Sequence, residues 1–363
     1  PTSGDVSISN GGRLTLNVAG TYGGTTQALN FNPNQTTNPS LDILSGAAVT
    51  WQGTVAINAD TRIEANGSGG NLTFSGNVSG SGNLIKQAAG TLTLSGTGNT
   101  MTGGTQIGNG TITVNSGSSL GTGSLALAQT STNATTVNLN NATQTIGNLS
   151  STFAASTGTI QQTLNLNGTA LTINQSGNTS FGTGAASTLT SVINGTGSVI
   201  LSSTSTGTLT LTGANSYSGG TTLNGGTLVV SNGTTGSATG TGTVLVNSGA
   251  TLASGTTGTI SGSVSFAAGS TLSPGGTGSI GTLNVGSTTF SGSSSTQTTW
   301  NLDVDLSTAT VTGDLLASTG TIDFGGVAAN GIKLNLNSVG SGVTEGTGRT
   351  FNFATGSVTN FSA

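Results

Sequence analysis

Four aspartates near the C-terminal end of the sequence form its densest group of acidic side chains. Asp303 and Asp305 alternate along one stretch, and Asp314 and Asp323 follow it. In a strand, Asp303 and Asp305 would share one face, and carboxylate oxygens are ligands that Ca²⁺ prefers. The spacing matches neither an EF-hand loop nor a Gly/Asp nonapeptide repeat. Two interpretations follow: a weak calcium site at Asp303 and Asp305, or carboxylates that are solvated or cap turns.

A second candidate for chemistry is the alternating triplet Asp60, Arg62 and Glu64. Two carboxylates that flank an arginine on one strand face could bind or cleave a polysaccharide. The alternative is an exposed strand face with ion pairs, each of little energetic value. Trp51 and Trp300 could stack on sugar rings or cover an interface, since both lie near the charged ends of the sequence.

The distribution of charge argues against catalysis. The 363 residues include five basic and nine acidic ones, with no His and no Cys, and no charged residue occurs between Lys86 and Asp303. Acid–base chemistry needs groups that titrate near neutral pH. We therefore expect no enzyme, no catalytic residue and no cofactor. Five basic residues also exclude nucleic-acid binding by phosphate neutralisation, and no apolar run is long enough for a transmembrane helix.

The elements that position these residues are short strands. Leu92 and Leu94 alternate with Thr91 and Thr93, and the same period of two recurs along the whole sequence. Gly, Asn and Ser separate these stretches and favour tight turns. Helix-forming residues are scarce, so the sequence predicts an all-β chain without a helix longer than about two turns.

Internal repetition distinguishes a stack of coils from a sandwich or barrel. Three short segments return in the same order: 90–96 as 207–213, 103–105 as 219–221, and 110–114 as 226–230. Each copy is too small to bury its own apolar face, so it must stack on its neighbours. The predicted buried core consists of Leu92, Leu94, Ile112, Val114, Leu209, Leu211, Leu228 and Val230.

The segment 207–230 resembles the autotransporter-associated β-strand repeat, also called the passenger-associated transport repeat. Segment 77–86 resembles the stretch that leads into such a repeat, while 269–285 is similar to a segment that often follows it. Segments 312–316 and 320–326 resemble the end of such passengers. The resemblance implies a secreted or surface-exposed β-solenoid of adhesive or structural function. Two positions relate to the repeat: Tyr217 occupies an aromatic position, and Leu201 replaces Lys86 in the second copy.

We predict a right-handed parallel β-solenoid with less regular ends. The hand follows from the general preference of parallel crossover connections. Three regions are expected: an N-terminal β region over 1–71, a repeat-bearing solenoid over 72–290 and a C-terminal β region over 291–363.

The predicted function is that of an extracellular rod or fibre subunit at a bacterial surface. Charged residues normally protect sheet edges from pairing with other chains, and the middle of this sequence has none. We expect the main partner to be another copy of the chain. The alternative is an adhesin that binds surface or matrix polysaccharide through its outer face, and a glycan-active β-helix enzyme is the third hypothesis.

Overall fold

The computed structural model describes residues 4–9, 11–33, 38–44, 46–66, 70–129, 133–153, 160–182, 189–307, 311–339 and 352–360. These residues form short strands joined by turns, and none of them lies in a helix. The all-β prediction is thus confirmed over these ranges. No helix long and apolar enough to cross a membrane occurs among them.

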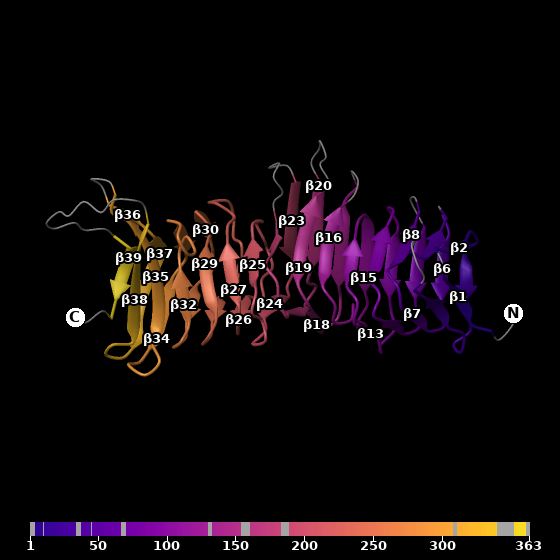
Figure 1. The fold of residues 1–363 in the computed structure, drawn as a ribbon, viewed down its shortest axis with the longest axis horizontal. Coiled ribbons are helices and arrows are strands. Elements are labelled where there is room, and N and C mark those ends of the chain that lie inside the picture. Colours follow the sequence, from indigo (N-terminus) through magenta and orange to yellow (C-terminus); the bar gives the residue numbers. More distant parts are fainter. Residues whose placement is uncertain are drawn as a thin grey trace. The chain divides into compact units, whose positions relative to one another are not determined.

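The chain divides into two compact units. Unit 1 comprises 1–173 and 183–197, and unit 2 comprises 174–182 and 198–363. Figure 1 shows the strands as parallel arrows in both colour ranges, indigo to magenta and magenta to yellow. The division into three regions expected from the sequence remains a prediction.

Unit 1 contains three parallel sheets, which successive strands of the chain enter in turn. The first sheet consists of β1 (Val6–Ile8), β4 (Leu29–Phe31), β7 (Val55–Ile57), β10 (Val78–Gly80) and β13 (Thr100–Met101). The second consists of β2 (Arg13–Leu16), β5 (Ser40–Ile43), β8 (Thr61–Ala65), β11 (Leu84–Gln87), β14 (Thr105–Ile107), β16 (Leu125–Gln129) and β19 (Leu149–Phe153). The third consists of β3 (Gly20–Tyr22), β6 (Ala48–Trp51), β9 (Asn71–Phe74), β12 (Thr91–Leu94), β15 (Gly110–Val114), β17 (Thr135–Leu139), β20 (Ile160–Asn165) and β23 (Leu189–Asn194). In addition, β18 (Thr143–Ile146) pairs with β21 (Ala170–Ile173).

Unit 2 is built in the same way from two sets of parallel strands. One set consists of β22 (Thr179–Phe181), β25 (Thr208–Leu211), β27 (Thr227–Val230), β29 (Thr251–Ser254), β32 (Thr271–Ser273), β35 (Thr298–Asp305) and β38 (Ile332–Val339). The other consists of β24 (Ser198–Leu201), β26 (Thr221–Leu223), β28 (Val244–Val246), β31 (Val264–Phe266), β34 (Thr288–Gly292), β37 (Leu315–Val327), β33 (Thr282–Val285), β30 (Thr257–Thr259) and β39 (Ala354–Thr359). The short strand β36 (Thr312–Gly313) pairs with β35 in the antiparallel direction.

The register of these strands aligns like residues from coil to coil. Leu92 of β12 pairs with Leu72 of β9 on one side and with Ile112 of β15 on the other. Because every second residue points inward, these pairings build continuous buried rows. This arrangement confirms the predicted parallel β-solenoid, whereas its hand remains a prediction.

Equivalent glycines shape the corner before the last strand of each repeat copy. Gly110 has a φ of 75° and Gly226 a φ of 65°, which is the left-handed region that favours glycine. A Cβ on Gly110 would also meet the carbonyl oxygens of Ala88 and Gly90 in the preceding coil. The corner is therefore restricted both by its backbone conformation and by close stacking.

The C-terminal end of unit 2 is less regular, as expected. The 13-residue strand β37 pairs with β33 through its first part and with β34 through its second. Its register shifts against both β34 and β39. Inside this end, the ring of Phe290 stacks between those of Phe266 and Phe324, with centroid distances of 4.9 and 5.3 Å.

Candidate functional site

The eight residues expected in the core have no solvent-exposed surface: Leu92, Leu94, Ile112, Val114, Leu209, Leu211, Leu228 and Val230. Tyr217 is also fully buried, and its hydroxyl lies 2.6 Å from the hydroxyl of Thr221. These residues form the buried interior, which holds the strands and their outward side chains in place.

Trp51 and Trp300 lie inside the units and not on an outer face. Trp51 is 3% exposed and Trp300 is 1% exposed. Trp51 continues the inward row of Tyr22 and Phe74, and Trp300 contacts the rings of Phe290 and Phe353. Since both indoles follow the inward half of the alternation, their buried faces are not available to stack on a sugar. The expected glycan contact through these two residues is therefore corrected to a packing role.

The aspartates expected as a weak calcium site bind protein donors. Asp303 accepts hydrogen bonds from the backbone N–H of Ser279 at 2.8 Å and from the Asn337 amide at 2.6 Å. Asp305 accepts from the N–H and hydroxyl of Ser307 at 2.8 and 2.6 Å, which lowers the pKa of its carboxyl. These contacts correspond to the turn-capping alternative, and no acidic cluster suited to a metal occurs among the described residues.

Asp314 is a buried carboxylate that bonds to the backbone of Asp303, and the sequence alone did not predict this contact. Its carboxylate accepts hydrogen bonds from the backbone N–H groups of Gly281 at 2.8 Å and Asp303 at 2.9 Å. Burial, with a smaller contribution from the nearby Asp303 charge, raises the pKa of Asp314 to about 6. Asp303 and Asp314 together connect the loop before β33 to β35 and β38.

Lys86 is a buried cation whose amine contacts backbone carbonyl oxygens. The amine donates hydrogen bonds to the carbonyl oxygens of Gln87 at 2.8 Å, Ala88 at 2.7 Å and Asn109 at 3.3 Å. Burial lowers the pKa of Lys86 to about 8. The amine thus satisfies the backbone at a corner of the coil, a role that only the three-dimensional arrangement reveals.

The triplet at Asp60 contains an ion pair within one strand. Arg62 and Glu64 on β8 are 2.7 Å apart, and the arginine side chain is half exposed. Asp60 accepts hydrogen bonds from the backbone and side-chain amides of Asn83 in the next coil, both at 2.9 Å. These contacts match the interpretation as an exposed, ion-paired strand face.

An uncovered apolar surface lies at the last coil of unit 2. Leu334 and Leu336 of β38 are 47% and 65% exposed, and Val358 of β39 is 52% exposed. Leu334 and Leu336 pair in register with the buried Trp300 and Leu302, so they continue inward rows beyond the last covered coil. Within the described residues, β38 pairs only with β35 and β39 only with β37. We call this surface the tail edge.

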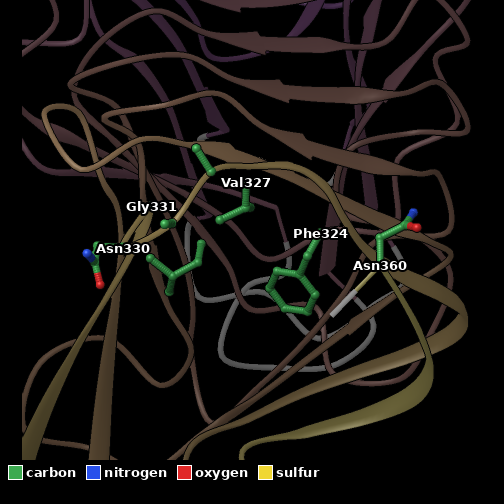
Figure 2. Close-up of a pocket in the computed structure, with 8 residues that line it drawn as sticks. Phe324, Val327, Asn330, Gly331 and Asn360 are labelled. Atoms are coloured by element: carbon green, nitrogen blue, oxygen red, sulfur yellow. The ribbon is translucent and has the colours of Figure 1, made fainter. Parts of the chain in front are cut away.

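Two hollows open beside the tail edge. Figure 2 shows the first, about 220 Å³, with Phe324, Val327 and Asn360 around it. The second, about 240 Å³, is lined mainly by aromatic and aliphatic side chains, including Trp300, Phe324 and Phe353. Both hollows expose parts of the aromatic stack that a further coil would cover.

The first coil of unit 1 has a corresponding open surface, which we call the head edge. In the described residues, β1, β2 and β3 each pair on one side only, with β4, β5 and β6. A hollow of about 690 Å³ beside them is lined by side chains that include Leu14, Leu16 and Tyr22. The head and tail edges offer apolar surface and unpaired backbone groups, which suit contact with another strand.

Comparison with known proteins agrees with the repeat found in the sequence. The family model described as passenger-associated-transport-repeat matches residues 84–114 and 204–230. The chain therefore carries two copies of this repeat, one in each unit. Neither a curated protein nor a solved structure matches the chain. Such repeats are typical of autotransporter passengers at the surface.

Proposed function

We propose that this chain is an extracellular structural protein, a rod or fibre subunit at a bacterial surface that acts by self-association. The observation that carries the proposal is the pair of open strand edges, each flanked by uncovered apolar side chains. Exposed edges readily pair with other chains unless charges or prolines protect them. The tail edge carries one lysine, Lys333, and the head edge carries one arginine, Arg13.

The scarcity of charge also determines how association responds to salt. With a formal net charge of −4 on 363 residues, long-range repulsion between copies is weak. Backbone pairing and apolar burial would then supply most of the association energy, and both persist when salt screens charges.

Light scattering of the intact chain over a range of protein concentrations tests this proposal. We expect the mean mass to rise with concentration and to stay raised in high salt. A chain that remains monomeric at high concentration, or that dissociates fully when salt is added, would contradict it.

A second candidate is a glycan-binding adhesin, which is favoured by uncharged polar rows on the outer face of unit 1. Thr73, Thr93 and Thr113 align in register, and the row continues with Asn138, whose amide lies 3.4 Å from the Thr113 hydroxyl. Hydroxyls and amides can bind sugars without charge. A glycan array probed with the intact chain tests this candidate, and selective binding that Thr93→Val weakens would support it.

A further inference from the structure

We propose that the tail edge of one chain binds the head edge of a second copy in a defined register. In this junction β3 of the incoming copy pairs in parallel with β38, and Arg13 and Leu14 at the start of β2 lie opposite Thr359, the last residue of β39, and Asn360. The inference rests on the self-association proposed above and specifies which surfaces meet.

The two repeat copies identify corresponding sheets. Segments 103–105 and 110–114 in the first copy match 219–221 and 226–230 in the second. Strand β14 therefore corresponds to β26, and β15 corresponds to β27. By their pairings, β2 and β3 begin the faces that contain β14 and β15, while β39 and β38 end the faces that contain β26 and β27.

The register between β3 and β38 follows from one inward row. In unit 1 this row runs from Gly20 through Val49, Leu72 and Leu92 to Ile112. In unit 2 the equivalent row starts at Leu228 and runs through Leu252, Leu272 and Trp300 to Leu334. Since Ile112 and Leu228 are equivalent, Gly20 of the second copy lies opposite Leu334. Thr21 then lies opposite Asn335, and Tyr22 lies opposite Leu336.

This register places complementary groups together on that face. Tyr22 is partly exposed at the head edge, and its ring would cover Leu336, which is 65% exposed. The Asn335 side-chain N–H already donates to the side-chain Oδ1 of Asn301 at 2.8 Å, which leaves the Oδ1 of Asn335 for a donor beyond it. The hydroxyl of Thr21 is such a donor.

The register between β2 and β39 follows in the same way from an outward row. Arg13 belongs to the row that includes Gln106 of β14. The residue equivalent to Gln106 in the second repeat copy is Thr222 of β26. The row of Thr222 ends at Asp323 and, in the next strand, Thr359. Arg13 of the second copy therefore lies opposite Thr359. Asp323 lies on the next strand beyond Thr359.

The charges of Arg13 and Asp323 and the hollow beside Asn360 are compatible with this second register. Within one chain, Arg13 already forms an ion pair with Asp42, a residue of the adjacent strand, so its side chain reaches across one coil. Across the junction Asp323, a charge of opposite sign, lies two strand spacings from Arg13 in the same outward row. Leu14 then takes the position next to Asn360, at the hollow in which Phe324 is exposed.

A second copy fits these edges because the junction repeats a contact that each unit already makes between coils. Among the described residues, the strands from β1 to β35 pair with one another in parallel between coils, with inward rows stacked on inward rows. A head edge and a tail edge reproduce that geometry, whereas two heads or two tails would meet in the antiparallel sense. A head-to-tail contact of this kind leaves a free edge at each end and can continue to a third copy.

The chain has no cysteine, so engineered cysteines report the register directly. One chain carries Thr21→Cys, the other carries Asn335→Cys, and the two are mixed under mild oxidation. Neighbouring parallel strands are about 4.8 Å apart, within the range for a disulfide. We expect a covalent heterodimer from this mixture and none from either variant alone.

Thr50→Cys provides the matched control for position. Thr50 lies in the same outward row as Thr21 but one coil further inside. Its distance from Asn335 across the junction would be about two strand spacings, too long for a disulfide. Mixed with Asn335→Cys, this variant should give no covalent heterodimer.

Leu336→Lys, compared with Leu245→Lys, tests the energetics of the junction. Both leucines are exposed, at 65% and 42%, but Leu245 lies on β28 within unit 2 and outside the tail edge. Leu336→Lys should weaken association about tenfold or more, because it removes a buried apolar contact and adds a charge. Leu245→Lys should leave association unchanged.

The outcomes separate the junction from self-association in general. Association without the Thr21–Asn335 cross-link, or with cross-links in the Asn335→Cys variant alone, would overturn the head-to-tail register and leave the proposed function standing. Absence of association in the unmodified chain would overturn both proposals. Circular dichroism of each variant verifies that it folds like the parent.

Discussion

At the scale of single residues, the buried charges are the least ordinary feature of this chain. Lys86 has backbone carbonyl oxygens around its amine, and Asp314 has two backbone N–H donors. Both side chains are buried, and burial moves the pKa of each toward neutrality. A sequence in which most side chains carry no charge therefore retains two buried groups that couple stability to pH near neutrality.

Asp314 should make unit 2 more stable in mild acid. Its pKa in the folded chain, about 6, lies above the ordinary value of 3.8. The folded state therefore binds the proton more tightly, and the stabilisation is lost as pH rises through about 6. Thermal unfolding followed by circular dichroism should show a higher melting temperature at pH 5 than at pH 7.

Asp314→Asn is the control for that experiment, because it removes the titrating group. The difference in melting temperature between pH 5 and pH 7 should shrink in this variant. An equal difference in parent and variant would show that another group is responsible.

Lys86 should act at higher pH. Its pKa in the folded chain is about 8, below the ordinary 10.5, so the unfolded chain binds more protons between these values. Stability should rise as pH increases from 8 to 9.5. Lys86→Leu, which places at this position the residue type found at Leu201 in the second copy, should abolish the rise. A rise of the same size in Lys86→Leu would contradict this assignment.

At the scale of strands, the alternation of apolar and polar residues accounts for most of the fold. The rows through Leu92 and Leu209 could be predicted because each strand repeats the same period and each copy repeats the same turns. The double pairing of β37 and the antiparallel β36 could not, since they depend on contacts between distant segments. The same holds for Lys86, whose carbonyl partner at Asn109 belongs to the next coil.

Leu211 tests the inward assignment. It is fully buried and pairs in register with Phe181 and Val230, so Leu211→Asp would place an unpaired carboxylate among apolar side chains. Such a change should cost several kcal/mol and lower the melting temperature strongly. Thr210→Asp, on the adjacent outward position, should have a much smaller effect. Similar melting of the two variants would refute the inward placement of Leu211.

The candidate site shows where sequence reasoning stops. Trp51 and Trp300 look like surface anchors in a polar sequence, but their register places them in inward rows. The tail edge was not apparent either, because Leu334 and Leu336 alternate like any core strand. Only the absence of a further strand beyond β38 among the described residues makes them an exposed surface.

At the scale of the whole molecule, the proposed association depends on the two open edges. Each coil buries its neighbour's apolar rows. Among the described residues, the strands of the first coil of unit 1 and of the last coil of unit 2 pair on one side only. A terminal coil whose apolar rows are uncovered tends to add further coils, and a second copy can supply them. The proposed surface function then arises from the fold itself and needs no reactive side chain.

Electron microscopy of the purified chain at high protein concentration and high salt tests this central claim most directly. The account predicts elongated assemblies of uniform width that shorten or disappear in Leu336→Lys and persist in Leu245→Lys. Isolated particles of monomer size, at every concentration and in both the parent and the variants, would contradict it.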